Sequence, residues 1–233
     1  MRIKYLLLFC VVGLLSYCLF FSDIFYTVKK DNDLNIDTNI FNTEDHIIDI
    51  NPPVIIIDYH ENEMILDNLQ APDSIVNQMA LVDVEYFGFD SLIHQGQIIV
   101  HNTVAEEVSL IFKELFIAKF PIEKVIPVVS YNWDDDLSMR DNNTSSFNYR
   151  SATNSGKLSS HALGLAIDIN PRLNPYVDRS GKIYPTNGVY NTSQRGTITD
   201  TSQCFRIFSE YGWKWGGHWR YSKDYQHFSK DGK

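Results

Sequence analysis

The chain has 233 residues, of which 44% are hydrophobic and 21% charged, a composition typical of a globular protein and not of a disordered one. Its formal net charge is −9, and because residues 1–22 carry +2, the remaining residues carry −11. An acidic body repels nucleic-acid phosphate, so we expect no nucleic-acid partner.

Residues 1–22 have the pattern of a membrane anchor or a signal peptide. Arg2 and Lys4 precede residues 5–22, which are uncharged and apolar enough to approach the roughly 20 residues that cross a bilayer as a helix. No A-x-A-like cleavage site follows, which favours a retained single-pass anchor over a cleaved signal. The pattern also leaves open lipidation at Cys18 and a buried soluble helix. In the favoured cases the rest of the chain lies outside the cytoplasm, on the periplasmic side of the membrane, and is secreted if the N-terminus is cleaved.

The following segment, residues 23–71, is predicted to be a linker with a possible short strand. Residues 23–51 are rich in Asn, Asp and Thr and show no clean hydrophobic periodicity. Two prolines then precede residues 54–57, a run of Val and Ile that could pack on the body as a strand. The compact domain is expected over residues 72–233.

Hydrophobic periodicity within residues 72–233 predicts both strands and helices. The expected elements are strands at 81–86, 96–101 and 125–131, loops at 87–95 and 134–160, and helices at 103–120 and 202–211. Pro121 and Gly212 follow the two helices and are typical of helix ends. The expected fold class is α+β, with a small antiparallel sheet and flanking helices.

The three cysteines do not predict a disulfide framework. Cys10 and Cys18 lie in the apolar N-terminal run, which leaves Cys204 alone in the body. Cys204 lies in the expected helix at 202–211, so we expect a buried structural thiol there.

Two segments carry the residues best suited to chemistry. In the first, Leu165, Ile167 and Ile169 alternate as on the core face of a strand, so Asp168 should point to the opposite face, toward a groove or solvent. His161 precedes this strand. The second segment, residues 212–228, has the sequence GWKWGGHWRYSKDYQHF and contains His227.

These residue types suit a zinc site. Zinc takes nitrogen from neutral His and oxygen from Asp, and a catalytic site keeps a fourth position open. His161, Asp168 and His227 could supply three ligands if the fold brings their segments together. A carboxylate must also take the proton of the attacking water, and Asp224, expected in the turn that enters the strand of His227, is the candidate. From the residues alone, a structural His–Asp hydrogen bond is the simpler alternative.

The order of these motifs resembles the M15 metallopeptidases. The pattern Ser-x-His-x-x-Gly-x-Ala-x-Asp at 159–168 is followed by Gly-Trp, Trp-Gly-Gly-x-Trp and Asp-x-x-His-Phe within 212–228. This family contains D-alanyl-D-alanine carboxypeptidase-like enzymes, including VanY-type carboxypeptidases and phage L-alanyl-D-glutamate endolysins. The resemblance runs from about residue 82 to residue 228. Position 224 is Asp, which resembles the endolysin-like branch of the family, whereas the other branches often carry Glu at this position.

The resemblance implies a hedgehog/DD-peptidase-like zinc peptidase fold and a set of roles. His161, Asp168 and His227 would hold one Zn²⁺ ion, and Asp224 would be the catalytic base. Arg150 matches a family arginine that orients substrate; the alternative is a salt bridge with an acid of residues 134–136. Ser159 is expected either to bind substrate or to cap a turn.

The remaining aromatic and histidine residues are expected to be structural. Trp213, Trp215 and Trp219 are predicted to pack in the core and the cleft wall, with sugar stacking as the alternative. His218 is predicted to lie near the site without binding the metal. His94 and His101, at the ends of a strand, are predicted to be structural.

The sequence therefore predicts a zinc-dependent peptidase that hydrolyses a peptide bond in peptidoglycan stem peptides. Three alternatives are a zinc phosphoesterase, a non-catalytic zinc-containing envelope binding module of the same fold, and an envelope protein that uses the metal for stability alone. The sequence does not separate a D-Ala-D-Ala carboxypeptidase from an L-Ala-D-Glu endopeptidase, and it does not indicate an oligomeric state.

Overall fold

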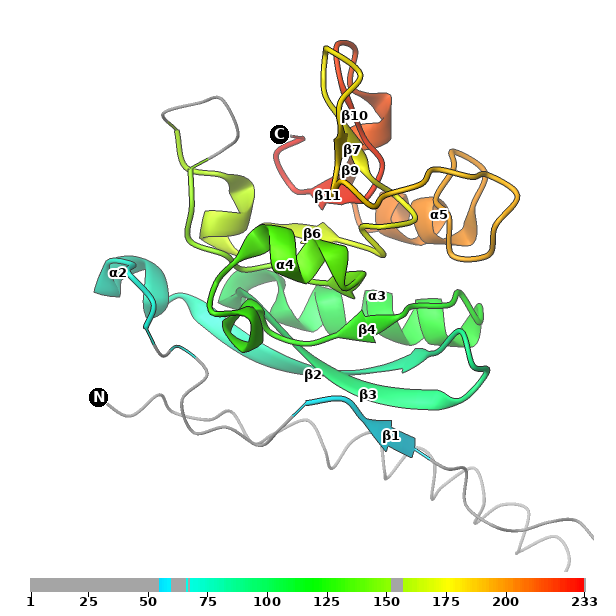
Figure 1. Ribbon diagram of the computed structural model, residues 1–233. Coiled ribbons are helices and arrows are strands. Elements are labelled where there is room, and N and C mark those ends of the chain that lie inside the picture. The colour runs from blue at the N-terminus through cyan, green and yellow to red at the C-terminus, as the bar shows by residue number, and fades with distance from the viewer. Residues whose placement is uncertain (1–54, 60–65, 67, 152–156, 233) are drawn as a thin grey trace, which may run out of the picture. The chain divides into compact units, whose positions relative to one another are not determined.

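The computed structural model describes residues 55–59, 66, 68–151 and 157–232 (Figure 1). The chain divides into two units between Asn51 and Pro52, and all described residues lie in the second unit, Pro52–Lys233. The expected anchor at 1–22 and the Asn-rich part of the expected linker lie outside the described residues. Within the described ranges, no helix is long and apolar enough to cross a membrane.

A long antiparallel hairpin forms the first half of the body. Strands β2 (Met79–Phe87) and β3 (Ile93–His101) pair along their whole length. The expected loop at 87–95 is therefore too long, because residues 93–95 belong to β3 and the turn closes through the Gly88 amide, which donates to the Leu92 carbonyl at 2.9 Å. Strand β1 (Ile55–Ile57), which lies in the run expected to form a short strand, pairs parallel with β3.

Helix α3 (Ala105–Ile117) covers the hairpin and is the centre of the core. The 3-10 turn η1 (Asn102–Val104) leads into it, so the amphipathic helix expected at 103–120 is confirmed with a shorter α-helical part. Its core face consists of Val108, Ile111, Phe112 and Leu115, all buried. This spacing of three and four residues is what places the four side chains on one stripe against β2.

Three short sheets make up much of the second half of the body. One has the order β6-β11-β9, with β6 (Ala166–Asp168), β11 (His227–Ser229) and β9 (Lys214–Trp215) all antiparallel. A second has the order β10-β7-β8, formed by Lys223–Asp224, Tyr176–Val177 and Ile183–Tyr184. The two-stranded sheet pairs β4 (Lys124–Val125) in parallel with β5 (Asn143–Thr144). In Figure 1, β1 lies on the side of the hairpin that faces away from β6 and β11.

Helix α5 (Gln203–Glu210) confirms the helix expected at 202–211. The Ser202 hydroxyl accepts from the Phe205 amide and caps its first turn, and Gly212 with φ +78° follows its last turn. Cys204 is fully buried, as expected, and burial raises the pKa of its thiol. Phe208 stacks on Phe228 at 4.1 Å between ring centroids, which joins α5 to β11.

Two expectations are wrong in the middle of the chain. The strand expected at 125–131 stops at Val125, because Pro127 leads into the 3-10 turn η2 (Val128–Tyr131). The long loop expected at 134–160 contains β5 and the short helix α4 (Asp135–Arg140), whose first turn is capped by the Asp134 carboxylate accepting from the Leu137 amide.

The remaining short elements are α2 (Asp73–Val76), η3 (Ser160–Leu163) and η4 (Gly216–His218). The fold class is α+β, as expected, although two of the strand pairs, β1 with β3 and β4 with β5, are parallel.

Candidate metal centre

The pairing of β6 with β11 places Asp168 directly opposite His227. In an antiparallel pair, opposite residues point to the same face of the sheet. Ile167 and Ile169 are fully buried in the core, so Asp168 points to the other face, as the alternation predicted. There it is buried in a group of polar side chains instead of facing solvent.

His161 reaches the same face from the 3-10 turn η3. The Ser159 hydroxyl caps this turn by accepting from the His161 amide at 3.3 Å. Gly164 ends the turn with φ +63°, and a Cβ at this position would lie 2.5 Å from the His101 amide nitrogen. Glycine is therefore required for η3 to lie against β3 and to hold His161 over Asp168.

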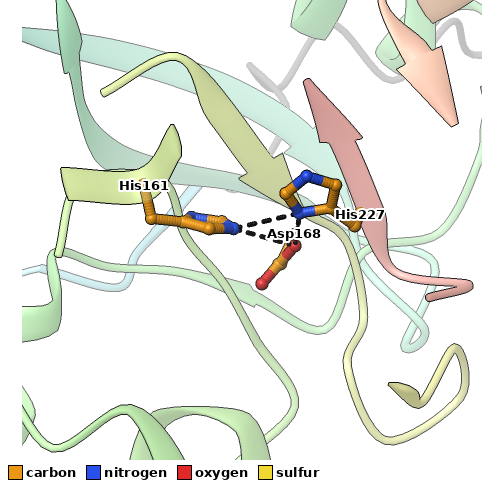
Figure 2. A group of neighbouring side chains, drawn as sticks. All are labelled: His161, Asp168 and His227. Carbon is orange, nitrogen blue, oxygen red and sulfur yellow. Dashed lines mark hydrogen bonds and ion pairs between the residues drawn. The ribbon is translucent and has the colours of Figure 1, made fainter. Parts of the chain in front are cut away.

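The three side chains converge on one point (Figure 2). Nε2 of His161 lies 3.1 Å from Nδ1 of His227, and Oδ1 of Asp168 lies 3.1 Å from Nδ1 of His227 and 3.3 Å from Nε2 of His161. Ligands bonded to tetrahedral zinc at about 2.0–2.1 Å stand about 3.3 Å apart. The three separations therefore fit three corners of a zinc tetrahedron.

The protonation of His161 is set by its outer neighbour. Its Nδ1 lies 2.7 Å from the carbonyl oxygen of Ser146, which accepts only, so Nδ1 carries the proton and Nε2 presents a lone pair to the cluster. Burial alone would raise the pKa of Asp168, but the adjacent His161 and His227 lower it well below its usual range. A carboxylate and two ring nitrogens facing one point require a shared proton or a cation between them.

The cluster is enclosed and consists of three possible ligands among the described residues. The side chains of His161, Asp168 and His227 are 5%, 8% and 6% exposed. In the part of the chain that the structure describes, no fourth His, Cys, Asp or Glu joins the group. Three protein ligands with an open fourth position are typical of catalytic zinc, whereas structural zinc takes four.

Asp224 ends strand β10, where it pairs with Tyr176, and two residues connect it to β11. It was expected in a turn and instead is held by strand pairing. Burial raises the pKa of Asp224 to about 7, and the charge of Asp168 acts in the same direction, while His227 acts in the opposite one. Its Oδ1 atom is buried and has no hydrogen-bond partner among the described residues. A buried carboxyl that titrates near neutral pH suits a general base.

Arg150 and Ser159 lie next to His161 in the structure. The Asn148 amide donates to the His161 carbonyl, and the Ser159 amide donates to the Arg150 carbonyl, both at 3.2 Å. The Arg150 guanidinium forms an ion pair with Asp135 at 2.9 Å, which is the alternative expected for it, and its Nε atom is buried without a partner in the described ranges. The Ser159 hydroxyl has the capping role that was one of its two expected roles.

Of two further neighbours of the cluster, Ser146 and Trp219, only Ser146 was not singled out from the sequence. The Ser146 carbonyl orients His161, and the ring of Trp219 packs on His227 at 5.3 Å between centroids. Ser146 lies in a stretch expected to be a loop, and nothing in its local pattern marks it. The Trp-Gly-Gly-x-Trp motif was the available signal for Trp219, whose packing role was expected.

The other residues predicted to be structural behave so. Trp213 and Trp215 are buried in the core, and His218 lies outside the cluster against Phe205 and Trp215. The ring nitrogens of His94 lie 2.8 Å from the Asp58 carboxylate and 3.1 Å from that of Asp90. Those of His101 lie 2.8 Å from the Thr103 hydroxyl and 2.7 Å from the Gln78 side chain.

Comparison with known families supports a peptidase context for this site. Residues 153–230 match the family described as D-alanyl-D-alanine carboxypeptidase, and this stretch contains His161, Asp168, Asp224 and His227. No curated protein and no solved structure matches the chain. The match confirms the predicted likeness to the M15 metallopeptidases and supports a peptidase. Arg150 lies just outside the matched residues.

Proposed function

We propose that the chain is a zinc-dependent peptidase that hydrolyses a peptide bond in peptidoglycan stem peptides, with the hedgehog/DD-peptidase-like fold of the M15 family. The observation that carries this proposal is the triangle of ligand atoms with edges of 3.1, 3.1 and 3.3 Å. The family match over residues 153–230 supports the reaction class. A cell-wall peptide substrate follows from the same likeness. We also propose that the chain is most similar to the L-alanyl-D-glutamate endolysin-like branch of the family.

His161, Asp168 and His227 would hold one zinc ion, and the donor set of two imidazoles and one carboxylate fits that metal. When bound, zinc supplies Lewis acidity that polarises the scissile carbonyl and acidifies a water molecule. The Ser146 carbonyl keeps the His161 lone pair directed at the cluster, and Trp219 restricts the ring of His227.

Asp224 would move the proton in this reaction. Its carboxylate takes a proton from the attacking water, whose oxygen bonds to the carbonyl carbon, and returns it to the amine nitrogen as the C–N bond breaks. The products are a carboxylic acid and a free amine. The buried, unpartnered Oδ1 atom of Asp224 is available for this proton.

Arg150 would orient the substrate. Its ion pair with Asp135 is partly exposed, so the cost of exchanging this partner for a substrate carboxylate or carbonyl is small. A guanidinium binds a carboxylate through two parallel hydrogen bonds, which fixes direction as well as position. Ser159 is proposed to contact the substrate next to Arg150.

The proposed location is the outer face of the cytoplasmic membrane, with residues 1–22 as the anchor. Its support is the apolar N-terminal run with its basic start, together with the location of peptidoglycan outside the cytoplasm. The acidic remainder of the chain argues against a nucleic-acid partner.

Digestion of purified muropeptides, followed by mass analysis of the products, tests the proposal. We expect one class of peptide bond to be cleaved, with loss of cleavage when a chelator removes the metal and recovery when zinc is restored. Asp224→Ala should retain zinc and lose cleavage. A chain that binds zinc and leaves every muropeptide intact would instead be the non-catalytic binding module.

A further inference from the structure

A hollow of about 280 Å³ shares the turn η4 with the metal centre. Its lining combines aromatic rings, polar side chains and part of η4: Tyr190, Thr192, Asp200, Trp215, Gly217 and His218. The volume is slightly below the roughly 300 Å³ at which ligand pockets start, and it suits a ligand of one or two small rings.

The turn η4 connects the hollow to the metal centre. Gly217 and His218 line the hollow. Gly216, the preceding residue, lies so close to Asp224 and His227 that a Cβ on it would stand 2.8 and 3.3 Å from their Cβ atoms. A ligand in the hollow is therefore separated from the proposed base by little more than one turn of backbone.

Aromatic rings give the hollow firm walls. Tyr190 stacks on Tyr225 with centroids 3.6 Å apart and planes 7° from parallel, and its hydroxyl donates to the Ile198 carbonyl at 2.8 Å. The rings of Trp215 and His218 meet edge to face at 5.1 Å. Tyr190 is half-buried and His218 is exposed, so these two rings offer flat surface at little cost in side-chain entropy, whereas Trp215 is only 6% exposed.

The polar groups of the hollow have free hydrogen-bonding capacity. Thr192, Asp200 and His218 are exposed, and their side chains make no hydrogen bond or ion pair within the described part of the chain. The described residues that line the hollow include the acidic Asp200 and no lysine or arginine. The hollow would therefore repel a phosphate or other anion. Flat aromatic walls combined with hydroxyl, carboxylate and imidazole groups suit a neutral ligand that is rich in hydroxyl and amide groups.

We infer that this hollow binds a neutral N-acetylated sugar, the glycan unit to which a stem peptide is attached. The inference rests on the proposed function and extends it from the peptide to the sugar. The apolar C–H face of a pyranose packs on the ring of Tyr190, and its hydroxyl and acetamide groups pair with Asp200, Thr192 and His218. A sugar held here places the first peptide bonds of its stem nearest to the metal centre.

The first test is direct binding of a peptide-free probe to the full chain. The disaccharide of N-acetylglucosamine and N-acetylmuramic acid is titrated with its lactyl carboxyl converted to a neutral amide, as the stem linkage makes it, and Trp215 in the wall of the hollow makes tryptophan fluorescence a suitable readout. We expect saturable binding that weakens about tenfold or more in Asp200→Asn and His218→Ala. Asp73→Asn, a surface aspartate of α2, is the matched control and should bind as the unaltered protein does. No saturation below about 10 mM, or binding unchanged in both hollow variants, overturns the inference.

The second test separates the sugar site from the peptidase. The kcat/KM for a stem peptide is compared with that for the same peptide on its disaccharide. We expect the sugar to raise kcat/KM about tenfold, and Asp200→Asn to remove this gain while free-peptide cleavage is unchanged. Equal cleavage of both substrates, with no disaccharide binding, refutes the sugar site and leaves the peptidase intact. Disaccharide binding with neither substrate cleaved refutes the peptidase and retains the sugar site.

Discussion

Gly216 packs against both the proposed base, Asp224, and one proposed metal ligand, His227. The substitution Gly216→Ala, which adds a single methyl group, tests this packing. In Gly216→Ala the new Cβ would lie 2.7 Å from the Asp224 carbonyl oxygen, 2.8 Å from the Asp224 Cβ and 3.3 Å from the His227 Cβ. Gly216 does not have a positive φ, so the substitution acts through these contacts and not through backbone strain.

The expected magnitudes follow from the contacts. Ordinary contact begins at 3.4 Å, so the Asp224 Cβ at 2.8 Å must retreat by about 0.6 Å. Because a misplacement of about 1 Å costs roughly 100-fold in rate, we expect kcat to fall about tenfold. Overpacking of this kind costs about 1–3 kcal/mol of unfolding free energy.

The assay compares kcat on muropeptides, zinc content and urea unfolding in Gly216→Ala and in a control. Gly212→Ala is suited to the control, since Gly212 has φ +78° and no neighbouring atom within 4 Å of an added Cβ. It should lose about 1 kcal/mol from backbone strain with unchanged kcat. Gly216→Ala with full kcat, or an equal loss of kcat in Gly212→Ala, would refute the reasoning.

The remaining predictions concern charge and metal. Because burial raises the pKa of Asp224 to about 7, the metal-free protein should lose stability as pH rises from about 4 to 7, and Asp224→Asn should flatten this slope in urea unfolding followed by circular dichroism. In the zinc-loaded enzyme the Asp224 carboxyl must be ionised to act as the base, so activity should rise with pH. The midpoint of this rise should lie at or below about pH 7, because the zinc cation favours the carboxylate. Activity found only at alkaline pH would contradict this prediction. Zinc at 100 times its Kd should stabilise the protein by about 2.7 kcal/mol, and an unchanged Tm after chelation would contradict a folded-state site. Asp135→Ala should cost about 1–2 kcal/mol of stability, because the pair with Arg150 is partly exposed but the buried Asn148 side chain also loses its acceptor, and it should alter KM. Unchanged KM together with unchanged kcat would separate Arg150 from substrate.

The parts of the fold that sequence predicts are those with strong periodicity. Helix α3 follows from apolar residues spaced three and four apart, and the orientation of Asp168 follows from its alternation with Ile167 and Ile169. Hydrophobic periodicity does not specify the strand register that places Asp168 opposite His227, because the two residues are 59 positions apart in the sequence. The motif order supplied that convergence through the likeness to a known family.

The segment around β5 shows why the rest was not predictable. It is polar in sequence and buried in the structure, because its side chains bond to backbone groups of other segments. Asn143 accepts from the Ile126 amide and donates to the Ile126 carbonyl, both at 2.9 Å, and the Thr144 hydroxyl accepts from the Asn170 amide at 3.1 Å. These polar side chains find their hydrogen-bond partners only in the tertiary structure. The sequence pattern of such a buried polar run is therefore the same as that of an exposed loop.

The ion pair of Arg150 with Asp135 has a similar origin. The sequence placed three aspartates sixteen to fourteen residues before Arg150 and left open whether they meet it. Helix α4 begins at Asp135, and the Asn148 side chain donates to the same carboxylate at 3.2 Å, so the choice among the three aspartates depends on where that helix packs.

Zinc stoichiometry in the unaltered chain and in single variants of the site tests the central claim most directly. After metal removal and reloading, mass spectrometry of the purified protein should find one zinc ion per chain. His161→Ala, Asp168→Ala and His227→Ala should each lose most of it, while Asp224→Ala keeps it. Full zinc retention in any of the first three variants would contradict the account, as would a chain that binds no zinc.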